Sequence, residues 1–107
     1  MADNINWHKV CPADEIEEED LIDIEINGEL YAVYRLKDGF YGTEGLCSHE
    51  GAPLAEGFVT GDTIECAKHN ARFHIPSGKA TRKPALRDLK TYPVKQEGND
   101  LFIGLPE

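Results

Sequence analysis

Two short segments of the chain each pair a cysteine with a histidine, and all four side chains are of types that bind metals. The first segment reads Cys47-Ser48-His49, and after sixteen further residues the second reads Cys66-Ala67-Lys68-His69. Because each pair is so closely spaced, a single tight loop can direct both of its side chains to the same inorganic centre. Such a ligand set suits either one tetrahedral zinc ion or a two-iron cluster with thiolates on one iron and imidazoles on the other.

The order of the ligands distinguishes these two kinds of site. Zinc fingers usually pair like ligands, two cysteines and then two histidines. Here each pair is mixed, so two facing loops can bring Cys47 and Cys66 together on the inner side and leave His49 and His69 on the outer side. A histidine-ligated [2Fe-2S] cluster requires this arrangement. A zinc ribbon, or four unrelated core residues, is the alternative.

At these positions the chain resembles the Rieske proteins, whose motif is Cys-x-His followed, after a similar interval, by Cys-x-x-His. Further likeness lies at Gly51, Pro53, Leu54, Gly57, Phe73 and Gly78. The resemblance covers nearly the whole chain, which looks like a small Rieske ferredoxin. It implies one [2Fe-2S] cluster in which Cys47 and Cys66 hold the buried iron while His49 and His69 hold the outer iron.

Four positions near the ligands differ from those of high-potential Rieske proteins. Those relatives carry a disulfide between the two loops and two hydroxyl groups that donate to the cluster. Here the disulfide positions are Ala52 and Lys68, and the hydroxyl positions are Ala71 and Phe73. Without those donors the reduced cluster is less stabilised, so we expect a potential toward the low end of the Rieske range, at about −150 mV.

Length, charge and cysteine count restrict the class of protein. The 107 residues predict one domain over 1–107, with a cluster-binding subdomain at about 43–85. The net charge of −9 argues against nucleic acid as a partner. We interpret the acidic run Glu15–Asp20 as a solvated turn, with a patch that steers partners as the alternative. Cys11 has no partner cysteine outside the ligand set, which favours a reducing compartment. We find neither a targeting segment nor an apolar run long enough for a membrane, and therefore expect a cytoplasmic location.

Short runs of alternating apolar and polar residues, separated by turn residues, predict an all-β chain. The expected strands are Trp7–Val10, Leu21–Ile26, Glu29–Leu36, Phe40–Thr43, Phe58–Val59, Thr63–Glu65, Arg72–Ile75, Thr91–Gln96 and Leu101–Ile103. In the second of these strands, Ile22, Ile24 and Ile26 alternate and should share one face. The predicted fold is an antiparallel β-sandwich with the cluster loops at one end.

Turn residues define the connections of this sandwich. Asn27-Gly28 and Asp38-Gly39 should form type I′ hairpin turns, because these residue types tolerate a positive φ. Gly61-Asp62 should join the two short strands that lead to the second ligand pair. Residues 79–88 are basic and include Pro84, so we expect a surface connection there without a strand.

With all four ligands supplied by protein, neither iron of such a cluster has a position for substrate, so we expect an electron carrier and not an enzyme. The resemblance implies a ferredoxin that passes single electrons from a NAD(P)H-dependent flavoprotein reductase to a terminal ring-hydroxylating oxygenase in aromatic hydrocarbon catabolism. We expect a monomer with weak docking to both partners. The alternatives are the small subunit of a reductase such as nitrite reductase, and a structural zinc module.

Overall fold

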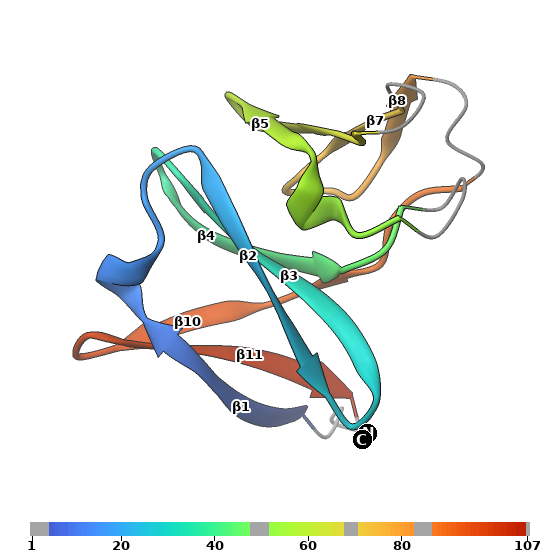
Figure 1. The fold of residues 1–107 in the computed structure, drawn as a ribbon. Helices are drawn as coiled ribbons and strands as arrows, with labels where there is room; N and C mark the ends of the chain where they lie inside the picture. The colour runs from blue at the N-terminus through green and yellow to red at the C-terminus, as the bar shows by residue number, and fades with distance from the viewer. Residues whose placement is uncertain (1–4, 48–51, 68–70, 83–86, 107) are drawn as a thin grey trace.

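The computed structural model describes residues 5–47, 52–67, 71–82 and 87–106 (Figure 1). Its strands are β1 (Ile5–Pro12), β2 (Asp20–Ile26), β3 (Glu29–Leu36), β4 (Gly39–Glu44), β5 (Phe58–Thr60), β6 (Thr63–Glu65), β7 (Arg72–His74), β8 (Ala80–Arg82), β9 (Thr91–Tyr92), β10 (Val94–Glu97) and β11 (Asp100–Pro106). Two single-turn 3-10 helices, η1 (Ala13–Glu15) and η2 (Leu54–Glu56), complete the described elements. Within these ranges, no helix is long and apolar enough to cross a membrane.

The strands form three antiparallel sheets, which confirms the predicted all-β fold class. One sheet has the order β1-β11-β10, and a second has the order β2-β3-β4-β9. The third sheet, β5-β6-β7-β8, is built from three-residue strands and stands at one end of the molecule, beside the second sheet (Figure 1). In the sequence, β5 and β6 lie between the two ligand pairs, and β7 and β8 follow the second pair. The third sheet is therefore formed by the region in which the cluster loops are expected.

Strand β3 is the centre of the packing because both of its faces are covered. Val33 is fully buried in one core, which it shares with Leu101 and Ile103 of the first sheet. Its neighbours Ala32 and Tyr34 point to the other face and belong to a second core. Successive side chains of a strand alternate between faces, so one strand can contribute to both cores. The middle sheet is therefore buried on both sides.

The pattern predicted for β2 is correct but incomplete. Ile22 and Ile26 pack against the core that contains Val33, as their alternation indicates. Leu21, on the opposite face, is also buried and belongs to the other core. A two-layer sandwich would leave Leu21 exposed, and the third sheet explains why it is covered.

One of the two predicted turns is confirmed, and the other has a different type. Asn27 and Gly28 have φ angles of 54° and 82°, as a type I′ turn requires. In the second hairpin, Gly39 is paired with Leu36, so the turn consists of Lys37 and Asp38. Both residues are described, and neither has a positive φ, so this turn is not type I′. The prediction placed the turn one residue too late.

The region after the second loop differs from the prediction in two places. Ala80–Arg82 is a strand, paired with β7, where a connection without a strand was expected. The expected single strand Thr91–Gln96 is divided at Pro93: the residues before it pair with β4 in the middle sheet, and those after it pair with β11. Proline has no amide hydrogen to continue a ladder, and this break lets the chain pass from one sheet to the next. Residues 83–86 lie outside the described residues.

Candidate metal centre

The first ligand loop follows β4, and the described residues at its two ends are paired with each other. The amide of Cys47 donates a hydrogen bond to the carbonyl oxygen of Ala52, five residues later, at 2.7 Å. Just outside this bond, Leu46 and Pro53 form an antiparallel bridge that closes the neck of the loop. The loop therefore begins and ends on paired backbone, which holds Cys47 in a defined place.

The second ligand loop has the same construction. The amide of Cys66 donates to the carbonyl oxygen of Ala71, again five residues later and again at 2.7 Å. Glu65 and Arg72 are paired at its neck, where β6 ends and β7 begins, and their side chains form an ion pair at 2.9 Å. Each cysteine thus occupies the same position in an equivalent loop, which suits two loops that hold one centre from two sides.

The two loop cysteines share a core that the third cysteine does not enter. Cys47 and Cys66 are only 2% and 1% exposed, and both belong to the core between the middle and third sheets. Cys11 lies in the core between the first and middle sheets. Burial, followed by the charges of Glu15 and Asp14, raises the pKa of the Cys11 thiol above its ordinary value. Cys11 is therefore a buried packing residue.

His49 and His69 lie outside the described residues, so their position as ligands stays a prediction. The structure does account for His74, which is at the surface of the third sheet. Its Nδ1 lies 2.7 Å from Ser77 Oγ, and its Nε2 lies 3.0 Å from Asp62 Oδ2. These contacts join the β5–β6 turn to the turn after β7. His74 is thus a structural residue of the third sheet.

The surroundings of the two thiols are apolar. Leu54, Ile64, Ala71 and Phe73 are fully buried in the same core as Cys47 and Cys66. Ala71 and Phe73 occupy the two positions where high-potential relatives carry hydroxyl groups, and neither side chain has a donor. Ala71 and Phe73 therefore cannot donate side-chain hydrogen bonds to a cluster held by these thiols.

Close packing of the backbone brings the segment after the first loop against the second. Gly57 follows η2, and a Cβ atom added there would lie 2.1 Å from the carbonyl oxygen of Glu65. Any residue larger than glycine would push η2 away from the end of β6, directly before Cys66. This explains the glycine at a position that contributed to the family resemblance.

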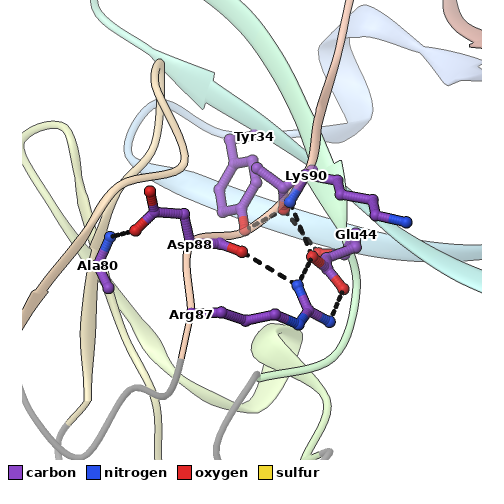
Figure 2. A network of polar contacts seen from close by, with 7 residues as sticks. Tyr34, Glu44, Ala80, Arg87, Asp88 and Lys90 are labelled. Atoms are coloured by element: carbon purple, nitrogen blue, oxygen red, sulfur yellow. Dashed lines mark hydrogen bonds and ion pairs between the residues drawn. The ribbon is translucent and has the colours of Figure 1, made fainter.

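A network of polar contacts, which the sequence did not predict, joins β4 to the segment 87–90 (Figure 2). The carboxylate of Glu44 accepts hydrogen bonds from Arg87 Nη1 at 2.6 Å, from Arg87 Nη2 at 2.8 Å and from the Lys90 amide at 2.7 Å. Burial alone would raise the pKa of Glu44, but these bonds and the positive charges of Arg87 and Lys90 outweigh it and hold the pKa below its ordinary value.

Beneath this network, two hydroxyl groups anchor the backbone of β4. Thr43 Oγ1 donates to the carbonyl oxygen of Glu44 at 2.7 Å, so the Tyr34 hydroxyl, 2.9 Å from Thr43 Oγ1, is the donor in the second bond (Figure 2). Tyr34 and Thr43 are both fully buried. Burial raises the pKa of Tyr34 far above its ordinary value, although the bond to Thr43 opposes this shift, so the phenol stays neutral and keeps its hydrogen.

Comparison with known proteins shows which family this chain resembles over most of its length. The family model for the Rieske [2Fe-2S] domain matches residues 6–93. The ferredoxin component of the naphthalene 1,2-dioxygenase/salicylate 5-hydroxylase systems of Ralstonia sp. is 40% identical over 98 residues, which are 92% of this chain and 94% of that protein.

Solved structures agree with this result. A chain of the complex of reduced oxygenase and oxidised ferredoxin in carbazole 1,9a-dioxygenase superposes with a TM-score of 0.86 at 33% identity, and the match covers 91% of each chain. An NADH-dependent nitrite reductase small subunit assigned in Mycobacterium tuberculosis has a TM-score of 0.85 over 96% of this chain and 97% of that chain. It is only 16% identical, so this likeness shows the fold alone.

The equivalent loops, the buried thiols and the matched relatives lead to one assignment. The family model spans most of the chain, and the matches with relatives named as ferredoxins cover at least nine tenths of both chains. The chain belongs to the Rieske [2Fe-2S] family, as a ferredoxin-type electron carrier and not a catalyst.

Proposed function

We propose that Cys47 and Cys66 bind one iron, and His49 and His69 the other iron, of a single [2Fe-2S] cluster. The observation that carries this proposal is the pair of buried thiols at equivalent positions of two equivalent loops, within one core. Thiolates are the ligands that iron–sulfur clusters require, and each cysteine is followed in the sequence by a histidine at the spacing of the family motif. The donor set therefore fits the cluster. Residues 43–85 would form the cluster-binding subdomain.

The residues around the thiols favour electron transfer over substrate chemistry. When bound, such a cluster accepts and returns one electron. Cys47 and Cys66 supply the thiolate ligands. They lie in a core in which the buried side chains of Leu54 and Phe73 help to exclude water. His49 and His69 would form the outer edge, where electrons enter and leave. Because Ala71 and Phe73 provide no hydroxyl donors, we propose a low reduction potential.

We further propose that the chain receives electrons from a NAD(P)H-dependent flavoprotein reductase and delivers them to a terminal ring-hydroxylating oxygenase in aromatic hydrocarbon catabolism. The oxygenase is supported by the Ralstonia relative, named as part of dioxygenase and hydroxylase systems, and by the carbazole 1,9a-dioxygenase complex, which contains an oxygenase. The reductase is supported by the family resemblance and by the proposed low potential. We propose a cytoplasmic monomer, since a carrier that visits two partners in turn needs weak docking to each.

Substitution of the histidines tests the ligand assignment. We expect His49→Ala and His69→Ala each to abolish the visible absorption and the reduced-state paramagnetic signal of the purified protein. His8→Ala, which removes a half-buried imidazole from β1, is the matched control and should keep both signals. If a His49→Ala or His69→Ala variant retained the full cluster and full electron transfer, the assignment would be wrong.

A further inference from the structure

We propose that Glu44 is a positioning residue for the metal centre: its carboxylate fixes the segment 87–90 against β4 and so determines where the two ligand loops stand relative to each other. This inference rests on the proposed function, because it assumes that the two loops hold one cluster. It assigns a role to a residue outside the ligand motif.

Glu44 is connected to the segment 87–90 by both its side chain and its backbone. It is the last residue of β4 and precedes Cys47 by three positions. Its carboxylate accepts the two bonds from Arg87 and the bond from the Lys90 amide, and its own amide donates to the carbonyl oxygen of Lys90 at 2.9 Å. The two-point contact with a guanidinium fixes orientation as well as distance. The strand that leads to the first loop is therefore firmly held by this segment.

The backbone at Glu44 is also fixed from the interior. Tyr34 donates to Thr43, and Thr43 donates to the carbonyl oxygen of Glu44. Because both hydroxyl groups are fully buried, water cannot replace these bonds without opening the core. The backbone of Glu44 is therefore fixed on β4. Because Arg87 is bound to the Glu44 carboxylate, the position of β4 determines the position of the segment 87–90.

The same segment is hydrogen-bonded on its other side to the sheet that carries the second loop. Asp88 Oδ1 accepts from the amide of Ala80 at 2.8 Å, and the amide of Leu89 donates to the carbonyl oxygen of Gly78 at 2.7 Å (Figure 2 shows the first bond). Ala80 is paired with Phe73 in β7, the strand that follows the second loop. A continuous path of hydrogen bonds thus runs from the strand before Cys47 to the sheet beside Cys66.

Packing reinforces this path at its midpoint. Leu89 is 4% exposed and lies in the same core as Cys47 and Cys66. Displacement of the segment 87–90 would therefore withdraw an apolar side chain from the core that holds both thiols. Such a change would loosen the enclosure of the site as well as the spacing of its loops.

Other ion pairs among the described residues do not have these properties. Lys95 and Glu97 are 3.1 Å apart on the same strand, and both side chains are well exposed. The Glu44 side chain is only 18% exposed and contacts an arginine 43 residues away. A one-point pair between exposed side chains contributes little to stability. In the Glu44 pair the Arg87 side chain is 55% exposed, but the carboxylate is largely buried and the contact is two-point, so it can fix two distant segments relative to each other.

The test compares Glu44→Gln with Glu97→Gln, which changes the net charge equally on a remote strand. In the cluster-loaded protein, we expect Glu44→Gln to lose iron to a chelator roughly tenfold faster than wild type, because charge-assisted bonds are lost. We also expect shifted g-values in the paramagnetic spectrum of the reduced protein. Glu97→Gln should match wild type in both. Arg87→Lys, which keeps the charge and loses the two-point contact, should be intermediate and serves if Glu44→Gln does not fold.

A second measurement does not need the cluster. In the iron-free chain, amide hydrogen exchange at Ala80, Leu89 and Lys90 should be faster in Glu44→Gln than in Glu97→Gln, while exchange in β11 is unchanged. If the wild-type chain takes up no iron and sulfide, the proposed function fails, and this exchange experiment still tests the coupling. If Glu44→Gln and Glu97→Gln agree in exchange, chelator rate and g-values, Glu44 has no positioning role.

Discussion

At the scale of single residues, the three cysteines differ in the core to which they belong. Cys47 and Cys66 lie in the core beside the third sheet, and Cys11 lies in the core on the other side of β3. The sequence separates Cys47 and Cys66 from Cys11 by their histidine-containing motifs, but it does not show in which core each thiol lies. This difference in core gives the thiols different roles that substitution can distinguish.

We predict that Cys47→Ser and Cys66→Ser each eliminate cluster binding, because each removes one of the two thiolates available in that core. Cys11→Ala should bind the cluster fully and lose only about 1 kcal/mol of stability, as expected for a small buried truncation. Iron and acid-labile sulfide content of the three variants, with thermal unfolding of the iron-free chains, measures both effects. If only Cys11→Ala lost the cluster, the assignment of Cys47 and Cys66 as the ligands and Cys11 as a packing residue would be wrong.

The absence of hydroxyl donors at Ala71 and Phe73 leads to a second prediction. In Ala71→Ser a hydroxyl group is introduced next to the second ligand loop, at the position where high-potential relatives have one. A new hydrogen bond to the reduced site should raise the potential, on the order of 50 mV. Ala13→Ser, a matched change in the other core, should leave the potential unchanged. Potentiometric titration compares them, and equal potentials in both variants would contradict the account.

The ligand motif could be predicted from the sequence because its four residues lie in two short segments. Glu44 and Arg87 could not, since 43 residues separate them and neither belongs to a motif. Their contact exists only because β4 and the segment after β8 lie side by side. Local patterns therefore revealed the candidate ligands and missed the residues that hold the ligand loops in place.

At the scale of elements, β3 and β4 form the base of the candidate site. The bond between Tyr34 and Thr43 joins these neighbouring strands, and the bond from Thr43 to Glu44 continues to the strand end. All of this lies within the core, so each bond replaces one that water would otherwise make. The two strands are thereby fixed where the chain enters the first loop.

We predict that Tyr34→Phe lowers the free energy of unfolding by about 1 kcal/mol, since it removes one buried hydrogen bond and little volume. For a domain of this size, the melting temperature should fall by roughly 4–8 °C. Tyr31→Phe is the control, because Tyr31 is half-buried and packs edge-on against Tyr92 with ring centroids 5.2 Å apart. Thermal unfolding of the iron-free variants provides the measurement, and an unchanged melting temperature for Tyr34→Phe would argue against the bond.

Acid should weaken the attachment of the segment 87–90. Burial raises the pKa of Glu44, but the contacts with Arg87 and Lys90 lower it by more. In the folded chain the pKa is therefore held below its ordinary value of 4.5. The ionised carboxylate therefore contributes its full stability above about pH 4.5, and this contribution is lost as the pH falls through the lower, folded-state pKa.

We accordingly predict that iron-free wild type is more stable than Glu44→Gln at pH 7 and that the difference decreases below pH 4.5. Urea unfolding at a series of pH values measures this difference. Glu97→Gln should show no comparable convergence with wild type. A stability difference for Glu44→Gln that stayed constant down to pH 2 would show that its carboxylate is not the titrating group.

Most strands could be predicted because alternation is a local property. The errors fall where pairing decides the structure. Ala80–Arg82 has no apolar alternation and becomes a strand because β7 lies beside it. Pro93 divides a run that reads as one strand, since the residues on its two sides pair with different sheets. In each case, the partner strand is distant in the sequence.

At the scale of the whole molecule, the predicted sandwich has a third layer. The middle sheet separates a core that stabilises the body from a core that contains the two loop cysteines. Three strands of the third sheet were predicted, at Phe58–Val59, Thr63–Glu65 and Arg72–Ile75. Their assembly with Ala80–Arg82 into a separate sheet could not be predicted, because strands of three residues carry almost no periodic pattern that indicates a pairing partner. Its position at one end of the molecule nevertheless agrees with the expected location of the cluster loops (Figure 1).

This arrangement assigns different tasks to the two cores. The core with Cys11 can vary in composition as long as its volume is kept, whereas the core with Cys47 and Cys66 must also exclude water and hold two loops in register. A carrier of single electrons needs such rigidity, because a centre that changes little in shape between its two oxidation states requires little reorganisation.

The most direct test is a reductive titration of the purified, anaerobically reconstituted protein, combined with metal and sulfide analysis. We predict a coloured protein with two irons and two sulfides per chain that takes up one electron and then gives a paramagnetic signal. A colourless protein that binds zinc, contains no sulfide and accepts no electron would contradict this prediction.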